Sequence, residues 1–155
     1  MVRMNARMAA LGPPSVGGPG GIELDPRLAA ILADGFLALG DCVVLAHEEG
    51  SVEATRIESY PDATGFEAFI NHLHLDDELG LPADDPIVIA QAGRYVTKLA
   101  ELLQSEYPDE RFAVIIAVGD SYVVRFHKQR TGESWVADDL EGYETEAVMV
   151  VHVPA

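Results

Sequence analysis

The stretch with the residue types best suited to bind a ligand runs from 125 to 144, RFHKQRTGESWVADDLEGYE. Its basic residues and the only tryptophan of the chain are Arg125, His127, Lys128, Arg130 and Trp135. Guanidinium groups bind carboxylates and phosphates through paired hydrogen bonds, and Trp and Arg dominate the energetics of many interfaces. One hypothesis is therefore a basic patch with an aromatic wall that binds a carboxylate, a phosphate or an acidic segment of a partner.

A structural role for the same stretch is the competing hypothesis. In it, Trp135 and Leu140 hold a crossover loop against the sheet, and the guanidinium groups pair with acidic residues of that loop. Those acids are Asp138, Asp139 and Glu141. Exposed ion pairs of this kind contribute about 0–1 kcal/mol each. Because a loop of this length needs such ties or carries function, both hypotheses stay open.

His72 and His74, followed by Asp76 and Asp77, have side chains that could bind zinc or another divalent ion. The predicted helix over 66–73 argues against this, since residues two apart in a helix point about 200° apart. The two rings converge only if the helix ends before His72 and the chain extends. The sequence therefore predicts a polar helix end that continues into an acidic loop, and no metal site.

Nucleophilic catalysis and nucleotide binding also lack their motifs. No Gly-x-Ser-x-Gly turn occurs, and the glycine-rich N-terminal segment precedes no strand and has no Walker-type lysine. Cys42 lies in an apolar run beside acidic residues, where a thiol is a small buried side chain. We therefore predict no catalytic residue and no cofactor. The alternative is a small-ligand or enzymatic domain in which Arg125 and Arg130 bind an anion and His127 is the acid or base.

Three helices are predicted from capping signals and one-sided apolar spacing, over residues 26–39, 66–73 and 86–107. Asp25 and Asp85 each precede a proline at a first helical position. Thr64 and Glu67 form a capping box for the second helix. Gly40 is the predicted end of the first helix.

Two hairpins and a last strand over 145–153 complete the predicted elements. The first hairpin is predicted over 41–60, with its turn at Glu49-Gly50, and the second over 111–128. A two-residue turn at Gly119-Asp120 would place Ala113 beside Phe126 under the long helix. The opposite face would then carry Arg125 and His127 beside Phe112, Val114 and Ile116. The predicted fold class is α+β: an antiparallel sheet of about five strands, packed on one face by about three helices.

The charge of the chain is its strongest compositional feature, with 26 acidic residues against 10 Lys and Arg and a net charge of −16. Residues 1–21 are rich in Gly and Pro and predict a flexible leader, and 22–155 predict a single domain. Such a surface repels nucleic acid and attracts a basic partner. A single cysteine and no apolar stretch near ~20 residues indicate a cytoplasmic protein without a membrane span.

These observations favour a non-catalytic interaction protein, of the inhibitor or immunity type, that binds a basic protein partner. Its contacts are predicted in two acidic loops, at residues Asp76, Asp77, Asp84, Asp138, Asp139 and Glu141. A third hypothesis is a homo-oligomer formed through Phe112, Val114 and Ile116 on the open face of the sheet.

Overall fold

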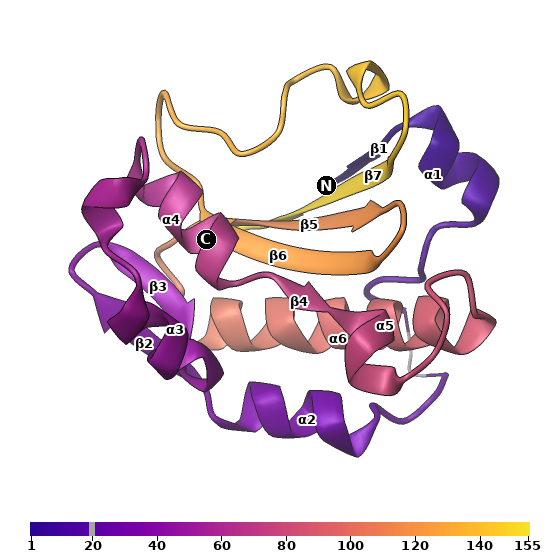
Figure 1. The fold of residues 1–155 in the computed structure, drawn as a ribbon, viewed down its shortest axis with the longest axis horizontal. Coiled ribbons are helices and arrows are strands. Elements are labelled where there is room, and N and C mark those ends of the chain that lie inside the picture. The colour runs from indigo at the N-terminus through magenta and orange to yellow at the C-terminus, as the bar shows by residue number, and fades with distance from the viewer. Residues whose placement is uncertain (19–20) are drawn as a thin grey trace.

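The computed structural model, which describes residues 1–18 and 21–155, contains a five-stranded antiparallel sheet packed against helices (Figure 1). From one edge to the other its strands are β1 (Val2–Met4), β7 (Ala147–Val153), β5 (Phe112–Val118), β6 (Tyr122–Lys128) and β4 (Leu73–His74). The described helices are α1 (Ala6–Leu11), α2 (Pro26–Ala33), α3 (Glu49–Ala54), α4 (Ala63–Ile70), α5 (Leu75–Leu79) and α6 (Pro86–Glu106). The predicted α+β class with about five antiparallel strands is confirmed.

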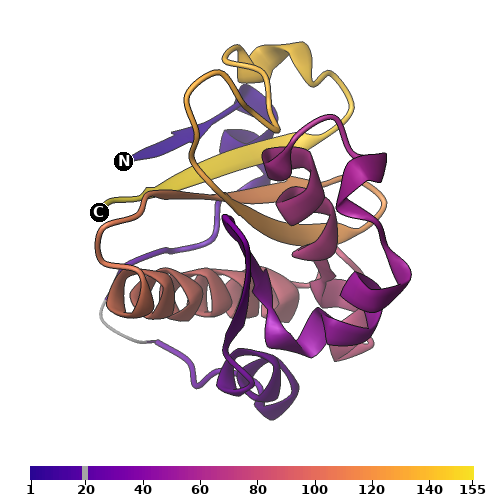
Figure 2. The same ribbon diagram turned by 90° about the vertical axis from the view of Figure 1, so that its left-hand side faces the viewer.

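The long helix α6 crosses one face of the sheet, and α2 and α5 pack against it (Figures 1 and 2). Asp85 caps α6 as predicted, since its carboxylate accepts a hydrogen bond of 2.8 Å from Ile87 N. The apolar seam of α6 is fully buried under the sheet. It consists of Val88, Ala92, Val96, Leu99 and Leu103. No helix within the described ranges combines the length and the apolar character needed to cross a bilayer.

The first predicted helix is too long, and the first predicted hairpin is misplaced. Helix α2 ends at Ala33, because Gly35 takes a left-handed conformation with φ 72° and turns the chain back. The next residues form β2 (Phe36–Leu39) and β3 (Cys42–Leu45), a separate two-stranded sheet with its turn at Gly40-Asp41. Residues 46–59, predicted as a strand and its turn, are short helical segments instead.

The predicted flexible leader is wrong for residues 2–11. Strand β1 pairs with β7 at the edge of the main sheet, and Met8 of α1 has no exposed surface. Asn5 joins α1 to β7, because its Oδ1 accepts hydrogen bonds of 3.0 Å from both Met8 N and Val148 N. These contacts order the segment despite the Gly- and Pro-rich residues that follow it. Residues 19–20 of the predicted leader lie outside the described residues.

The loop of the second hairpin is one residue longer than predicted. Val118 pairs with Tyr122, so the loop contains Gly119, Asp120 and Ser121 rather than Gly119 and Asp120 alone. The shift moves the side chains of β5 to the other face of the sheet relative to β6. As a result Phe112, Val114 and Ile116 lie under α6, each with no exposed surface. The hypothesis of oligomerisation through these three residues is therefore wrong.

The face of the sheet opposite α6 carries Arg125 and His127, as predicted, but beside Ala113 and Ile115 of β5. Part of this face is covered by residues 129–146, which we call the crossover loop (Figure 2). The apolar side chains of the loop that pack there are Val136, Leu140 and Tyr143. The predicted role of Leu140 as a tie between loop and sheet is thus confirmed.

Alanine substitutions at two helical glycines should change the free energy of unfolding in opposite directions. A Cβ at Gly93 of α6 would lie closer to Ser15 O than Cβ atoms approach other atoms, and 3.1 Å from Ser15 N. We expect Gly93→Ala to lower the free energy of unfolding by about 1–3 kcal/mol, although Ala is the better helix former. Gly50 of α3 has open space around it, so Gly50→Ala should raise that free energy by up to about 1 kcal/mol. Urea unfolding of both variants measures the two changes in the free energy of unfolding.

Candidate functional site

Lys128 and Arg130 of the predicted basic patch lie in an internal ion-pair network. Lys128 Nζ contacts Asp41 Oδ1 and lies 3.3 Å from Glu110 Oε1. Arg130 Nε donates to Asp41 Oδ2 at 2.9 Å, and the two remaining guanidinium nitrogens donate to Glu67 at 2.7 and 3.0 Å. The hydrogen bonds from Lys128 and Arg130 hold the pKa of Asp41 below its usual range. These two cations therefore hold elements of the fold together rather than a ligand.

Glu67 is the centre of this network and does not form the capping box with Thr64 that the sequence predicts. Its side chain is fully buried, and its two oxygens also accept hydrogen bonds from Val43 N at 2.7 Å and Lys128 N at 2.8 Å. The N-cap of α4 is Asp62, whose carboxylate accepts from Gly65 N at 2.7 Å. Glu67 thus fastens the small β2–β3 sheet to strand β6.

Asn71 repeats this connection one helical turn after Glu67. Its Oδ1 accepts a hydrogen bond of 2.9 Å from Leu45 N, and its Nδ2 donates to Val43 O at 2.9 Å and to Phe126 O at 3.2 Å. The side chain is buried, so these bonds satisfy groups that water does not reach. Glu67 on α4 and Asn71 at its C-cap therefore join both sheets.

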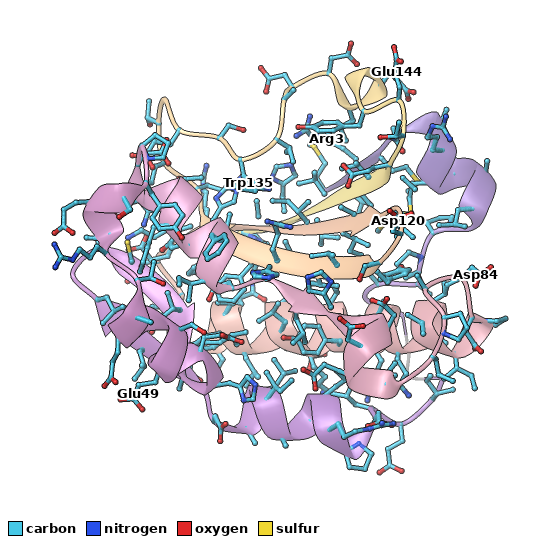
Figure 3. All side chains as sticks on the ribbon, viewed as in Figure 1. Arg3, Glu49, Asp84, Asp120, Trp135 and Glu144 are labelled. Carbon is cyan, nitrogen blue, oxygen red and sulfur yellow. The ribbon has the colours of Figure 1, made fainter. Side chains whose placement is uncertain are left out.

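Arg125 and Trp135 come together as the basic-patch hypothesis predicts. The guanidinium carbon of Arg125 lies 4.9 Å from the centre of the Trp135 ring, in cation–π contact. Arg125 also donates a long hydrogen bond of 3.4 Å to Ala68 O of α4. Figure 3 shows Trp135 on the crossover loop above the sheet. Partial burial lowers the pKa of Arg125, and no carboxylate within the described residues lies within 4.0 Å of it.

His127 does not join Arg125 and Trp135 in a shared site. Its ring is almost completely buried, and Nδ1 lies 2.9 Å from Lys128 O. Burial lowers the pKa of this imidazole below its ordinary value of 6.5, against the opposing effect of the hydrogen bond to Lys128 O. A buried ring bound to backbone is poorly placed to exchange protons with a substrate, so the geometry gives the predicted acid–base role no support.

The lowered pKa of His127 predicts a pH dependence of stability. The folded protein keeps this ring neutral at pH values where the unfolded chain, with an ordinary pKa near 6.5, already takes up a proton. The free energy of unfolding should therefore fall as the pH decreases from about 6.5 toward the folded-state pKa, by at most about 1.4 kcal/mol per pH unit. Urea unfolding between pH 7.5 and 5.5 should give a shallower slope for His127→Gln. Equal slopes in the two proteins would contradict a neutral buried ring.

The acids of the crossover loop do not pair with the guanidinium groups of Arg125 and Arg130. Asp138 accepts a hydrogen bond of 3.0 Å from Arg3 through its backbone oxygen, and Asp139 caps the 3-10 turn at Leu140–Gly142. Glu141 Oε1 accepts from Ala6 N, the first residue of α1, at 2.9 Å. Asp138 and Glu141 thus tie the loop to Arg3 and Ala6 near the N-terminus, and Asp139 acts within the loop, so the ion pairs of the structural hypothesis are not formed by these three acids.

The other predicted acidic contacts surround a cleft of about 720 Å³ at one end of the sheet. Asp76 and Asp84 line it from one side, and Asp120 lines it from the tip of the β5–β6 hairpin. Figure 3 shows Asp84, Asp120 and Glu144 at this end of the molecule. Asp77 is exposed beside Asp76 on α5, a short helix where the sequence predicts a loop, and is not part of the lining. We call this feature the acidic cleft, and its remaining lining residues are Arg7, Leu11, Pro82, Ala83, Val118, Gly119, Thr145 and Ala147.

A hydrogen-bonded chain of His74, Ser121 and Asp76 lies beside the acidic cleft. Ser121 Oγ donates to Asp76 Oδ1 at 2.7 Å and lies 2.7 Å from His74 Nδ1. Because the serine proton is directed at the carboxylate, the histidine has no proton to remove, and Ser121 is not activated as a nucleophile. Burial acts to raise the pKa of Asp76, but hydrogen bonds from Ser121 and Tyr122 N outweigh it and leave the pKa below its usual value.

The rings of His72 and His74 converge, because the helix before them ends early enough for the chain to extend. Helix α4 ends at Ile70, and the chain extends through His72 into β4, so that the ring centres of His72 and His74 are 5.3 Å apart. Within the described part of the chain, however, no group of three or more metal-binding side chains surrounds them. The convergence therefore makes a pair of imidazoles on an edge strand, without the further ligands that a zinc site uses.

Comparisons with known proteins give a family but no activity. Residues 18–155 match the model of the family described as the uncharacterized protein PM0498 family, and the chain belongs to that family. No curated protein matches the chain, and no solved structure matches it.

Proposed function

We propose that this member of the PM0498 family is a non-catalytic interaction protein of the inhibitor or immunity type, which binds a basic protein partner in the cytoplasm. The unpaired charge of the surface supports the proposal. Of 26 acidic residues, only six have a Lys, Arg or His group within 4.0 Å among the described residues. The electrostatic field of such a negatively charged surface accelerates the approach of a basic partner and repels nucleic acid.

The acidic cleft is the observation on which the proposal rests. Asp84 and Asp120 both line one concavity and have no ion-pair partner among the described residues. Thr145, at the end of the crossover loop, also lines the cleft, and the Glu146 side chain lies 3.6 Å from the position of a Cβ on Gly119, whereas Asp138, Asp139 and Glu141 are not part of the lining. Its volume of about 720 Å³ is enough for a lysine or arginine side chain of a partner.

Affinity capture at two salt concentrations tests the proposal. The immobilised protein should retain a basic protein from a native lysate at about 0.01 M salt, and release it near 0.15 M, where the Debye length shortens from about 30 Å to about 8 Å. The double variant Asp84→Asn/Asp120→Asn should retain about tenfold less of that protein. The control Glu53→Gln/Glu58→Gln removes the same charge from exposed residues outside the acidic cleft and should retain it normally.

Three outcomes would contradict the proposal. They are the absence of a retained basic protein, retention that does not change with salt, and equal losses in the cleft variant and in its control. The last outcome would show that net charge, rather than the acidic cleft, determines retention.

A further inference from the structure

Arg125 has a local environment that is unusual for an arginine in so acidic a protein. Its guanidinium is partly shielded from water and has no carboxylate within 4.0 Å among the described residues. Among the described residues its five N–H donors form one hydrogen bond, at 3.4 Å to Ala68 O, and none of its nitrogens is both buried and unbonded. The carboxylate of Glu146 acts on it electrostatically but is not within ion-pair distance, so the remaining N–H groups are free to bind an anion.

Two imidazoles lie on the same face of the sheet as Arg125. His74 pairs with Val123, two residues before Arg125, and directly opposed residues of antiparallel strands have their side chains on one face. The ring of His72 lies 5.3 Å from that of His74, on the edge of the sheet that β4 forms. We call Arg125, His72 and His74 the Arg–His strip. None of its members is ion-paired in the described structure.

Exposed aromatic rings border the Arg–His strip. Trp135, stacked on Arg125, is 39% exposed, and Phe69, which follows the carbonyl that Arg125 contacts, is 44% exposed. The ring of Phe69 is also 5.4 Å from that of His72. Exposed rings of this size beside a guanidinium offer stacking surface for the apolar part of a ligand whose charged end binds the arginine.

We infer that Arg125 binds an oxyanion, a carboxylate or a phosphate, carried on an aromatic body. The guanidinium binds the oxyanion through its free N–H groups, and His72 and His74 border the site on the same face of the sheet. Phe69 and Trp135 contact the aromatic body. The charge of Arg125 is opposite to that of the acidic cleft, and the site does not depend on the function proposed above. His72 and His74 take the place beside Arg125 that the sequence predicts for His127.

Four small probes test this site through the fluorescence of Trp135, the only tryptophan of the chain. Benzoate and phenyl phosphate carry the aromatic body, and acetate and inorganic phosphate do not. At about 0.15 M salt, which screens the overall negative charge, we expect saturable binding of at least one aromatic probe. Its counterpart without the ring should bind more weakly. The stronger of the two aromatic probes identifies the oxyanion as carboxylate or phosphate.

Variants of Arg125 decide whether it is the binding group. Arg125→Gln should weaken the binding at least about tenfold, and Arg125→Lys should also weaken it, because lysine lacks the planar fork. Arg111→Gln removes the same charge from an exposed arginine before β5 and should bind as the unaltered protein does. Calorimetric titration of each variant, with thermal unfolding as the check of folding, measures affinity without the tryptophan signal. Absence of binding of all four probes, unaltered affinity in either Arg125 variant, or an equal loss in Arg111→Gln would overturn the inference.

Discussion

Glu67→Ala is expected to lower the free energy of unfolding by about 3–5 kcal/mol, a large part of the total stability of a domain of this size. The substitution leaves the guanidinium of Arg130 without its buried partner at 2.7 and 3.0 Å. It also leaves two buried backbone N–H groups, of Val43 and Lys128, without an acceptor. Each loss carries the full cost of an unsatisfied buried group, so the effect exceeds that of an ordinary ion pair.

Urea unfolding with a matched control measures this effect. Glu101→Ala removes an exposed carboxylate that pairs with Lys98 at 2.7 Å on α6, and should change the free energy of unfolding by no more than about 0.5 kcal/mol. Glu67→Gln keeps the shape of the side chain but places an amide N–H₂ against donors, so its loss should be smaller than that of Glu67→Ala. Similar small effects in the Ala variants of Glu67 and Glu101 would show that the buried network is not what joins the two sheets.

The fold class could be predicted from the sequence because its strongest local signals agree with the structure. Asp85-Pro86 starts α6, the apolar seam of that helix is buried, and residues 145–153 contain β7. The first hairpin was misplaced because the apolar residues from 28 to 39 fit one helical face as well as a helix followed by a strand. Only the positive φ of Gly35 and Gly40 decides between them, and a sequence does not display backbone angles.

The register of the second hairpin shows where the hydrophobic pattern carries no information. Strand β6 alternates apolar and basic residues, so the face of Arg125 and His127 was predicted correctly. Strand β5 is buried on both faces, one under α6 and one under the crossover loop, and all of its residues are apolar. A strand of this kind has no alternation that would fix its register. The extra loop residue, Ser121, therefore could not be recognised from the strand itself.

The candidate site was only partly predictable, for reasons that particular residues make clear. Arg125 and Trp135 were selected together and do meet, because their residue types favour stacking. Lys128 and Arg130 were selected with them, but their acceptors Asp41 and Glu67 lie more than sixty positions away in the sequence. Glu67 left one signal that could have been used. It is the only charged residue between 63 and 70, in an otherwise apolar or small-residue helix.

Phe112→Ala is expected to lower the free energy of unfolding by about 3–5 kcal/mol, and this result separates the two hairpin registers. In the structure Phe112 has no exposed surface and contacts the rings of Tyr107 at 5.9 Å and Phe126 at 6.2 Å under α6. In the register predicted from a two-residue turn, the same side chain would lie on the open face of the sheet, and its removal would cost little.

Phe69→Ala is the matched control for Phe112→Ala, because Phe69 is the same residue type but 44% exposed on α4. It should lower the free energy of unfolding by no more than about 1 kcal/mol, since nearly half of its surface is already in water in the folded protein. Chemical denaturation of both variants under one set of conditions gives the comparison. A loss below about 1 kcal/mol in Phe112→Ala would restore the two-residue turn and return Phe112, Val114 and Ile116 to the open face. That face would then be apolar beside Arg125, and oligomerisation through it would again be the simplest use of the sheet.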